Sequence, residues 1–109
     1  MRLILCGYTG HMGKEVRECA ARTEGFEIVA GVDPMIPASE GICVKTFEEC
    51  TAEADALIDF SHHSLTGEML EFAEKRSLPV VLATTGQTEA EKDRIRKAAE
   101  KIPVFLAAN

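Results

Sequence analysis

Apolar residues in this chain gather in five short runs, separated by longer segments in which apolar positions recur with a helical period. The runs are nearly continuous rather than alternating, which is typical of parallel strands covered on both faces of a sheet. They predict strands at residues 2–6, 27–32, 56–60, 79–83 and 103–108.

Three of the intervening segments carry apolar residues spaced by three, four, seven or eight positions, which places them on one face of an α-helix. These series are Met12, Val16, Cys19 and Ala20; Leu65, Met69, Phe72 and Ala73; and Ile95, Ala98, Ala99 and Ile102. Capping-box patterns begin at Thr88 and at Thr46, and the second predicts only a short helix. Residues 33–42, with two prolines and a glycine, predict a loop.

Strands separated by helices need crossover connections, which are almost always right-handed. The order therefore predicts an α/β fold with a doubly wound parallel sheet. With 109 residues and no internal repeat or linker, the chain is expected to form one domain. The last predicted strand reaches the end of the chain without a closing helix, so we expect a piece cut at the boundary to a second domain.

The first predicted strand opens directly into a glycine-rich turn, GYTGHMG at residues 7–13. Such a turn places bare backbone N–H groups at a helix N-terminus, where they bind the pyrophosphate of a dinucleotide. Asp33, 20 residues after Gly13, ends the second strand, where a carboxylate accepts hydrogen bonds from the adenosine ribose. An Asp before proline also serves as a plain turn former, but the glycine turn favours the ribose role and a Rossmann-like domain.

Two further polar segments follow predicted strands and should lie at the same sheet edge. The adjacent His62 and His63 suggest metal or acid–base chemistry, but no ligand spacing completes a site, and a polar loop leading into a helix is favoured. Phe60, just before them, could flank a nicotinamide ring. Thr84 and Thr85 could hydrogen-bond a carboxamide or ribose, or could simply form a strand-to-helix turn.

The composition narrows the classes of function. A net charge of −6 argues against a general nucleic-acid or anionic-membrane surface. No apolar run approaches the roughly 20 residues of a membrane span. The short N-terminal run is too brief for a signal peptide, so a cytoplasmic location is expected. The four cysteines, Cys6, Cys19, Cys43 and Cys50, show no metal-ligand spacing and are expected to be buried, reduced thiols.

Together these motifs resemble the 4-hydroxy-tetrahydrodipicolinate reductases (dihydrodipicolinate reductases) of lysine and diaminopimelate biosynthesis. The matching stretches are residues 7–13, 59–62, 83–86 and 107–109, and they belong to that family's N-terminal cofactor domain. The resemblance implies an NAD(P)H-dependent oxidoreductase whose substrate and oligomerisation domain is absent from residues 1–109. The full-length protein would be a homo-oligomer that acts on a small cyclic dicarboxylate.

The resemblance also implies which residues hold the cofactor. They are Gly7, Tyr8, Thr9, Gly10, His11, Met12, Asp33, Phe60, Ala83, Thr84, Thr85, Ala107, Ala108 and Asn109. The family's catalytic acid belongs to the second domain, so no catalytic residue is expected in this chain. Two other functions stay open: another two-domain NAD(P)-dependent dehydrogenase, and a stand-alone dinucleotide-sensing module.

NADH is expected to be favoured over NADPH. The Asp33 carboxylate should repel a 2′-phosphate, and Pro34 beside it offers no cation. His11 is mostly neutral near pH 7. Lys14 and Arg17 are expected to project from the first helix away from the ribose.

Overall fold

The computed structural model describes residues 1–107 of the chain. Six strands form one parallel sheet in the order β3-β2-β1-β4-β5-β6. The strands are β1 (Arg2–Cys6), β2 (Glu27–Val32), β3 (Cys43–Val44), β4 (Ala56–Asp59), β5 (Val80–Leu82) and β6 (Val104–Leu106). The helices are α1 (His11–Ala21), the 3₁₀ turn η1 (His63–Leu65), α2 (Thr66–Arg76) and α3 (Glu89–Ala99).

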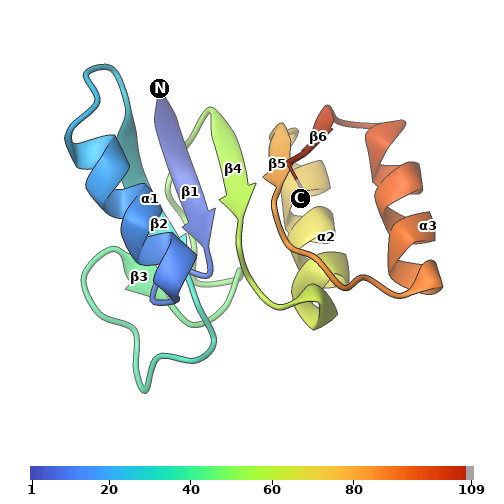
Figure 1. Ribbon diagram of the computed structural model, residues 1–109, viewed down its shortest axis with the longest axis horizontal. Helices are drawn as coiled ribbons and strands as arrows, with labels where there is room; N and C mark the ends of the chain where they lie inside the picture. The colour runs from blue at the N-terminus through green and yellow to red at the C-terminus, as the bar shows by residue number, and fades with distance from the viewer. Residues whose placement is uncertain (108–109) are drawn as a thin grey trace.

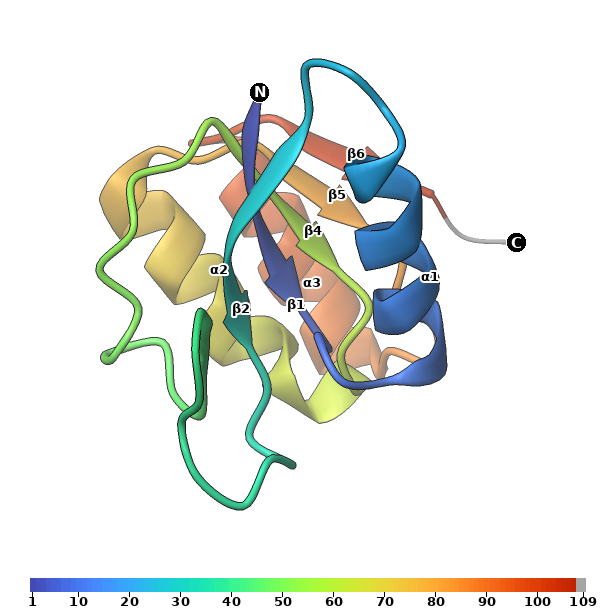
Figure 2. The ribbon, with the colours of Figure 1, turned by 90° about the vertical axis from the view of Figure 1, so that its left-hand side faces the viewer.

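The helices are divided between the two faces of the sheet, so the fold is doubly wound as predicted. Helix α1 lies against one face beside β1 and β2, and α2 and α3 lie on the other (Figures 1 and 2). The strand order reverses at β1, which pairs with β2 on one side and β4 on the other. Ligands of open α/β sheets bind at the carboxyl ends of the strands where such a reversal occurs.

The predicted elements match the observed ones with three exceptions. The 3₁₀ turn η1 lies where a polar loop was expected. Strand β3 was not predicted, because a two-residue strand is too short to show a period. The short helix predicted at Thr46 is wrong. Its capping hydrogen bond is present, from the Glu49 N–H to the Thr46 hydroxyl at 3.3 Å, but it closes a single turn before the buried Cys50.

The main core lies between the sheet and the pair α2 and α3. Leu57 and Val80 of the sheet and Met69 and Leu70 of α2 are completely buried there. Helix α1 is covered less well, and Gly13 is its one buried residue. The expectation of four buried thiols is therefore wrong for Cys19, which is exposed on α1, where its sulfur lies 3.9 Å from the Thr23 hydroxyl.

A buried carboxylate joins the ends of β4 and β5. Asp59 is fully buried and accepts hydrogen bonds from the Ser61 N–H at 3.0 Å, from the Ser61 hydroxyl, and from the Thr84 hydroxyl at 3.1 Å. Burial raises the pKa of Asp59, and the hydrogen bonds from Ser61 and Thr84 oppose that rise. The network holds two loops at the carboxyl edge of the sheet in fixed relative positions.

Asp59→Asn should remove a pH-dependent cost of folding. Because the pKa of Asp59 is raised in the folded protein, the native state binds the proton more tightly than the unfolded state. The contribution of Asp59 to stability is therefore largest below the ordinary aspartate pKa of 3.8 and is lost as the pH rises through the raised value. Relative to wild type, the variant should therefore become more stable from pH 4 to pH 8, which urea titrations would show as a larger free energy of unfolding. A difference that stays constant across this range would contradict the prediction.

Candidate functional site

The turn between β1 and α1 presents open backbone at the carboxyl edge of the sheet. Gly7 donates its N–H to the Val32 carbonyl of β2 at 3.0 Å, and Gly10 donates to the Gly7 carbonyl at 3.1 Å. Gly10 caps α1, whose first turn contains no acidic side chain. The N–H groups of that turn have no partners within the helix, and with the helix dipole they favour a bound anion.

Two glycines of this turn have no room for a side chain. A Cβ on Gly13 would lie 2.1 Å from the Gly7 carbonyl oxygen, and one on Gly7 would lie 2.7 Å from the Phe60 carbonyl. Gly7 also has a φ of +80°, which side-chain-bearing residues rarely adopt. Gly10 differs, because a Cβ there would lie 3.4 Å from its nearest neighbour. Packing therefore requires Gly7 and Gly13, whereas Gly10 lies open beside a cavity.

Asp33, at the end of β2, binds the glycine turn directly. Its side chain is buried, with 5% exposed, and it accepts a hydrogen bond from the Thr9 N–H at 2.9 Å and one from the Thr9 hydroxyl. The Met35 N–H donates to its other oxygen at 2.9 Å. A carboxylate offers about four acceptor sites, so three of these are used inside the protein. Asp33 thus fixes the turn as well as offering an acceptor to a ligand.

A cavity of about 570 Å³ opens where the glycine turn, the loop after β2 and the loop after β4 meet. Its lining residues are Gly7, Thr9, Gly10, Asp33, Pro34, Met35, Phe60, Ser61, His62, Ser64 and Leu65. The structure therefore brings together Gly7, Thr9, Gly10, Asp33 and Phe60, five of the residues expected to bind the cofactor. A cavity of this size is in the range of small-molecule sites.

Four other residues expected to bind the cofactor follow β5 and β6 along the same sheet edge but do not line this cavity: Ala83, Thr84, Thr85 and Ala107. The Ala83 N–H donates to the Asp59 carbonyl at 3.0 Å, and the buried Thr84 hydroxyl donates within the Asp59 network. Thr85 is exposed. The exposed Ala107 donates its N–H to Leu82 at 2.9 Å. Ala108 and Asn109 lie outside the described residues.

A second contact joins η1, after β4, to the first turn of α3, after β5. His63 Nδ1 lies 2.8 Å from Glu91 Oε1, and Glu91 also accepts from the Thr88 N–H as part of the capping box of α3. The hydrogen bond from Thr88 is the largest cause that lowers the pKa of Glu91, and the contact with His63 adds to it. The His62 ring lies against the His63 ring, with the centroids 4.3 Å apart, but His62 lines the cavity and its Nδ1 lies 2.8 Å from the Ser64 hydroxyl. The two histidines thus have different polar partners.

The remaining residues of the glycine turn face away from the cavity. The side chain of Tyr8 packs on Gly31 of β2, where a Cβ would lie 2.2 Å from the ring. His11 pairs with Glu15 at 3.3 Å on the surface of α1, and Met12 is 44% exposed.

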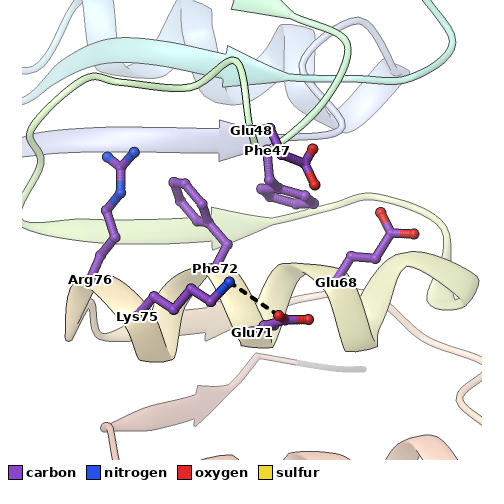
Figure 3. A pocket seen from close by; sticks show the side chains of 7 residues that line it. All are labelled: Phe47, Glu48, Glu68, Glu71, Phe72, Lys75 and Arg76. Atoms are coloured by element: carbon purple, nitrogen blue, oxygen red, sulfur yellow. Dashed lines mark ion pairs between the residues drawn. The ribbon is translucent and has the colours of Figure 1, made fainter.

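A cavity of about 240 Å³ lies between α2 and the segment before β4, and its charged side chains are shown in Figure 3. Lys75 is paired with Glu71 at 3.2 Å, and Arg76 donates to the Ala52 carbonyl at 2.9 Å and to the Cys50 carbonyl. Its cations therefore already have partners, and none of its lining residues belongs to the glycine turn. The carboxyl-edge cavity is the better candidate for an anionic ligand.

Sequence reasoning missed several residues of the site. Met35 and Ser64 line the cavity, but neither periodicity nor a motif distinguishes them from ordinary loop residues. Leu65, which its helical spacing marked only as an apolar helix position, also lines the cavity, at the end of η1. Asp59 could have been found, because a carboxylate at the end of an apolar strand needs internal hydrogen-bond donors when it is buried.

The residues at this edge fit a dinucleotide. Gly7 and Gly13 allow the turn to pack tightly, and Gly10 lets a pyrophosphate approach the backbone amides at the N-terminus of α1. Asp33 lies at the end of the neighbouring strand, where the ribose of the adenosine half belongs. The cavity continues along Phe60 and the loop after β4.

Comparison with known proteins agrees with this geometry. The family model described as dihydrodipicolinate reductase, N-terminus, matches residues 1–109. A 4-hydroxy-tetrahydrodipicolinate reductase of Caldanaerobacter subterraneus is 40% identical over the whole chain, which covers 43% of that relative. One from Exiguobacterium sibiricum is also 40% identical over the whole chain, which covers 42% of it. The chain thus spans less than half the length of these relatives.

Solved structures show the same fold. The dipicolinate-bound dihydrodipicolinate reductase from Paenisporosarcina sp. TG-14 superposes with a TM-score of 0.80 at 24% identity, over 98% of this chain and 46% of that one. A myo-inositol dehydrogenase from Corynebacterium glutamicum reaches 0.74 at 21% identity, over 96% of this chain and 35% of that one. At such low identities these likenesses show only a shared fold, and dehydrogenases that act under other names have it too. On the family match over its full length, the chain belongs to the dihydrodipicolinate reductase family, in the N-terminal part of those proteins.

Proposed function

We propose that this chain is the dinucleotide-binding part of an NAD(P)H-dependent 4-hydroxy-tetrahydrodipicolinate reductase of lysine and diaminopimelate biosynthesis. The observation that carries the proposal is the glycine turn at the N-terminus of α1, held by Asp33 at the edge of a cavity of about 570 Å³. The family match over residues 1–109 supports the choice of this reductase over other dehydrogenases.

In this proposal the protein positions the cofactor, and the bound cofactor supplies a hydride from its nicotinamide ring. The N–H groups at the start of α1 hold the pyrophosphate, and Asp33 accepts from the adenosine ribose. Phe60 flanks the path toward the nicotinamide half. Thr84 and Thr85 lie further along that path, the hydroxyl of Thr84 being used to hold the loop to Asp59.

The substrate, a small cyclic dicarboxylate, and the acid that donates a proton would belong to the larger part of the full-length protein. Phe105 and Leu106 of the edge strand β6 are 60% and 69% exposed, and such apolar surface supports a neighbouring domain or subunit. We propose a cytoplasmic homo-oligomer as the full-length form. Within the part of the chain that the structure describes, no helix is long and apolar enough to cross a membrane.

Gly10→Val should abolish tight cofactor binding and leave the fold intact. The valine side chain would enter the cavity beside the backbone amides, and its Cβ has an ordinary contact of 3.4 Å. Loss of a charge-assisted hydrogen bond lowers affinity by about 10- to 100-fold. Calorimetry with NADH should show this loss, while circular dichroism stays unchanged.

Gly67→Val is the matched control, because a Cβ at this α2 position meets nothing within 4 Å. It should bind NADH as wild type does. Gly13→Val should lose binding for a different reason, since its Cβ would overlap the Gly7 carbonyl and disturb the turn itself. Unchanged NADH affinity in a folded Gly10→Val variant would mean that the turn has been misassigned.

The isolated chain should bind NADH measurably and yet catalyse no reduction of 4-hydroxy-tetrahydrodipicolinate. The physical reason is that the proposed cofactor site is built from residues of this chain, whereas the substrate and proton-donor sites belong elsewhere. Fluorescence titration of NADH and a steady-state assay of NADH oxidation measure the two properties. Sustained substrate-dependent turnover by residues 1–109 would refute this division of roles.

NADH should bind at least as tightly as NADPH at pH 8. The Asp33 carboxylate lies where a 2′-phosphate would add a like charge, and Pro34 follows it. His11, on the surface of α1, is already paired with Glu15 at 3.3 Å. Titrations of both cofactors at pH 6 and pH 8 test this, and a marked NADPH preference at pH 8 would contradict it.

A further inference from the structure

The loop between β5 and α3 is held at its two ends by different contacts. At its start, the buried Thr84 hydroxyl donates to Asp59 at 3.1 Å, which fixes this end to β4. At its end, Thr88 begins α3 with a capping box. Thr85 and Gly86 lie between these points, and both are exposed. The position of this exposed part therefore depends on how firmly the start of α3 is held.

His63 of η1 holds the start of α3. Its Nδ1 lies 2.8 Å from Oε1 of Glu91, in the first turn of that helix. An ionised carboxylate only accepts hydrogen bonds, so Nδ1 of His63 carries the proton and donates. The two side chains are 29% and 21% exposed, and a pair shielded in this way contributes more than one on the open surface. The same oxygen accepts from the Thr88 N–H at 2.8 Å, so His63 is joined directly to the cap.

The ring of His63 has two further neighbours. One is the His62 ring, with the centroids 4.3 Å apart, and His62 lines the carboxyl-edge cavity. The other is Gly86, where a Cβ would lie 3.6 Å from Cδ2 of His63. Gly86 has a φ of +85°, which glycine adopts without strain, so the loop turns closely beside the ring. His63 thus connects the cavity wall, the exposed part of the loop and the start of α3.

We propose that His63 is a positioning residue, which through Glu91 fixes residues 84–88 against the cavity wall at His62. The inference rests on the proposed function, because it assumes that the nicotinamide half of the cofactor lies along Phe60 and Thr85. A loop that is already ordered binds this half without a further loss of conformational entropy. The adenosine half lies at the glycine turn, so its binding should not depend on the pair.

The test compares NADH with ADP-ribose, which lacks the nicotinamide ring. Binding to the 109-residue chain is measured by calorimetry for wild type, His63→Leu and His63→Asn. Leucine fills the space without a donor, so it should weaken NADH by about fivefold or more and ADP-ribose by less than about twofold. Asparagine places an amide N–H near the position of the histidine Nδ1–H. His63→Asn should therefore restore most of the lost NADH affinity, which a role in packing alone would not predict.

Glu91→Gln tests the other partner. Glutamine keeps a capping oxygen for Thr88 but removes the charge, so NADH should bind less tightly while ADP-ribose is unaffected. In the His63→Leu background the same change should have no further effect, because both residues act through one contact. Glu71→Gln is the matched control. It makes the same charge change at an exposed pair with Lys75 on α2, and it should bind both probes as wild type does.

The remaining outcomes would count against the inference. Equal weakening of both probes by His63→Leu, no weakening of either, or no recovery in His63→Asn would overturn it. Equal affinity of wild type for the two probes would also overturn it, because the nicotinamide ring would then gain nothing from the loop. Thermal unfolding identifies a variant that fails to fold, and His63→Ala then replaces His63→Leu. Wild-type protein that binds neither probe would refute the proposed function itself, a result distinct from a selective loss of NADH.

Discussion

The close packing of the turn between β1 and α1 is the constraint on which the rest of the site depends. The Gly7 carbonyl would lie 2.1 Å from any Cβ on Gly13, and the backbone of Phe60 leaves no room for one on Gly7. Three segments therefore meet with only backbone between them, and α1 starts beside the carboxyl end of β1 (Figure 1). This places the positive end of the helix dipole at the reversal of strand order, where a bound anion gains most from it.

Two buried carboxylates fix the loops around that turn, in different ways. Asp33 accepts from Thr9 and so joins the end of β2 to the glycine turn, while Asp59 accepts from Ser61 and Thr84 and joins the ends of β4 and β5. Burial of such a group is costly unless hydrogen bonds compensate it. The hydrogen bonds that stabilise these carboxylates are the same ones that set the shape of the cavity. Stability and preorganisation of the site are thus linked through a few residues.

The sequence by itself determined the fold class, the first two strands to the residue, and the glycine turn with Asp33 as the candidate site. These follow from local rules. Strands and helices have different periods of apolar residues, and only a few glycine-rich sequences can form a tight turn between a strand and a helix. Tertiary structure alone decided that Arg17 turns back over Tyr8, that Cys19 is exposed, that Thr46 closes a turn and not a helix, and that β3 exists. Each of these depends on which surfaces meet across segments distant in the chain, and no local period or spacing records such contacts.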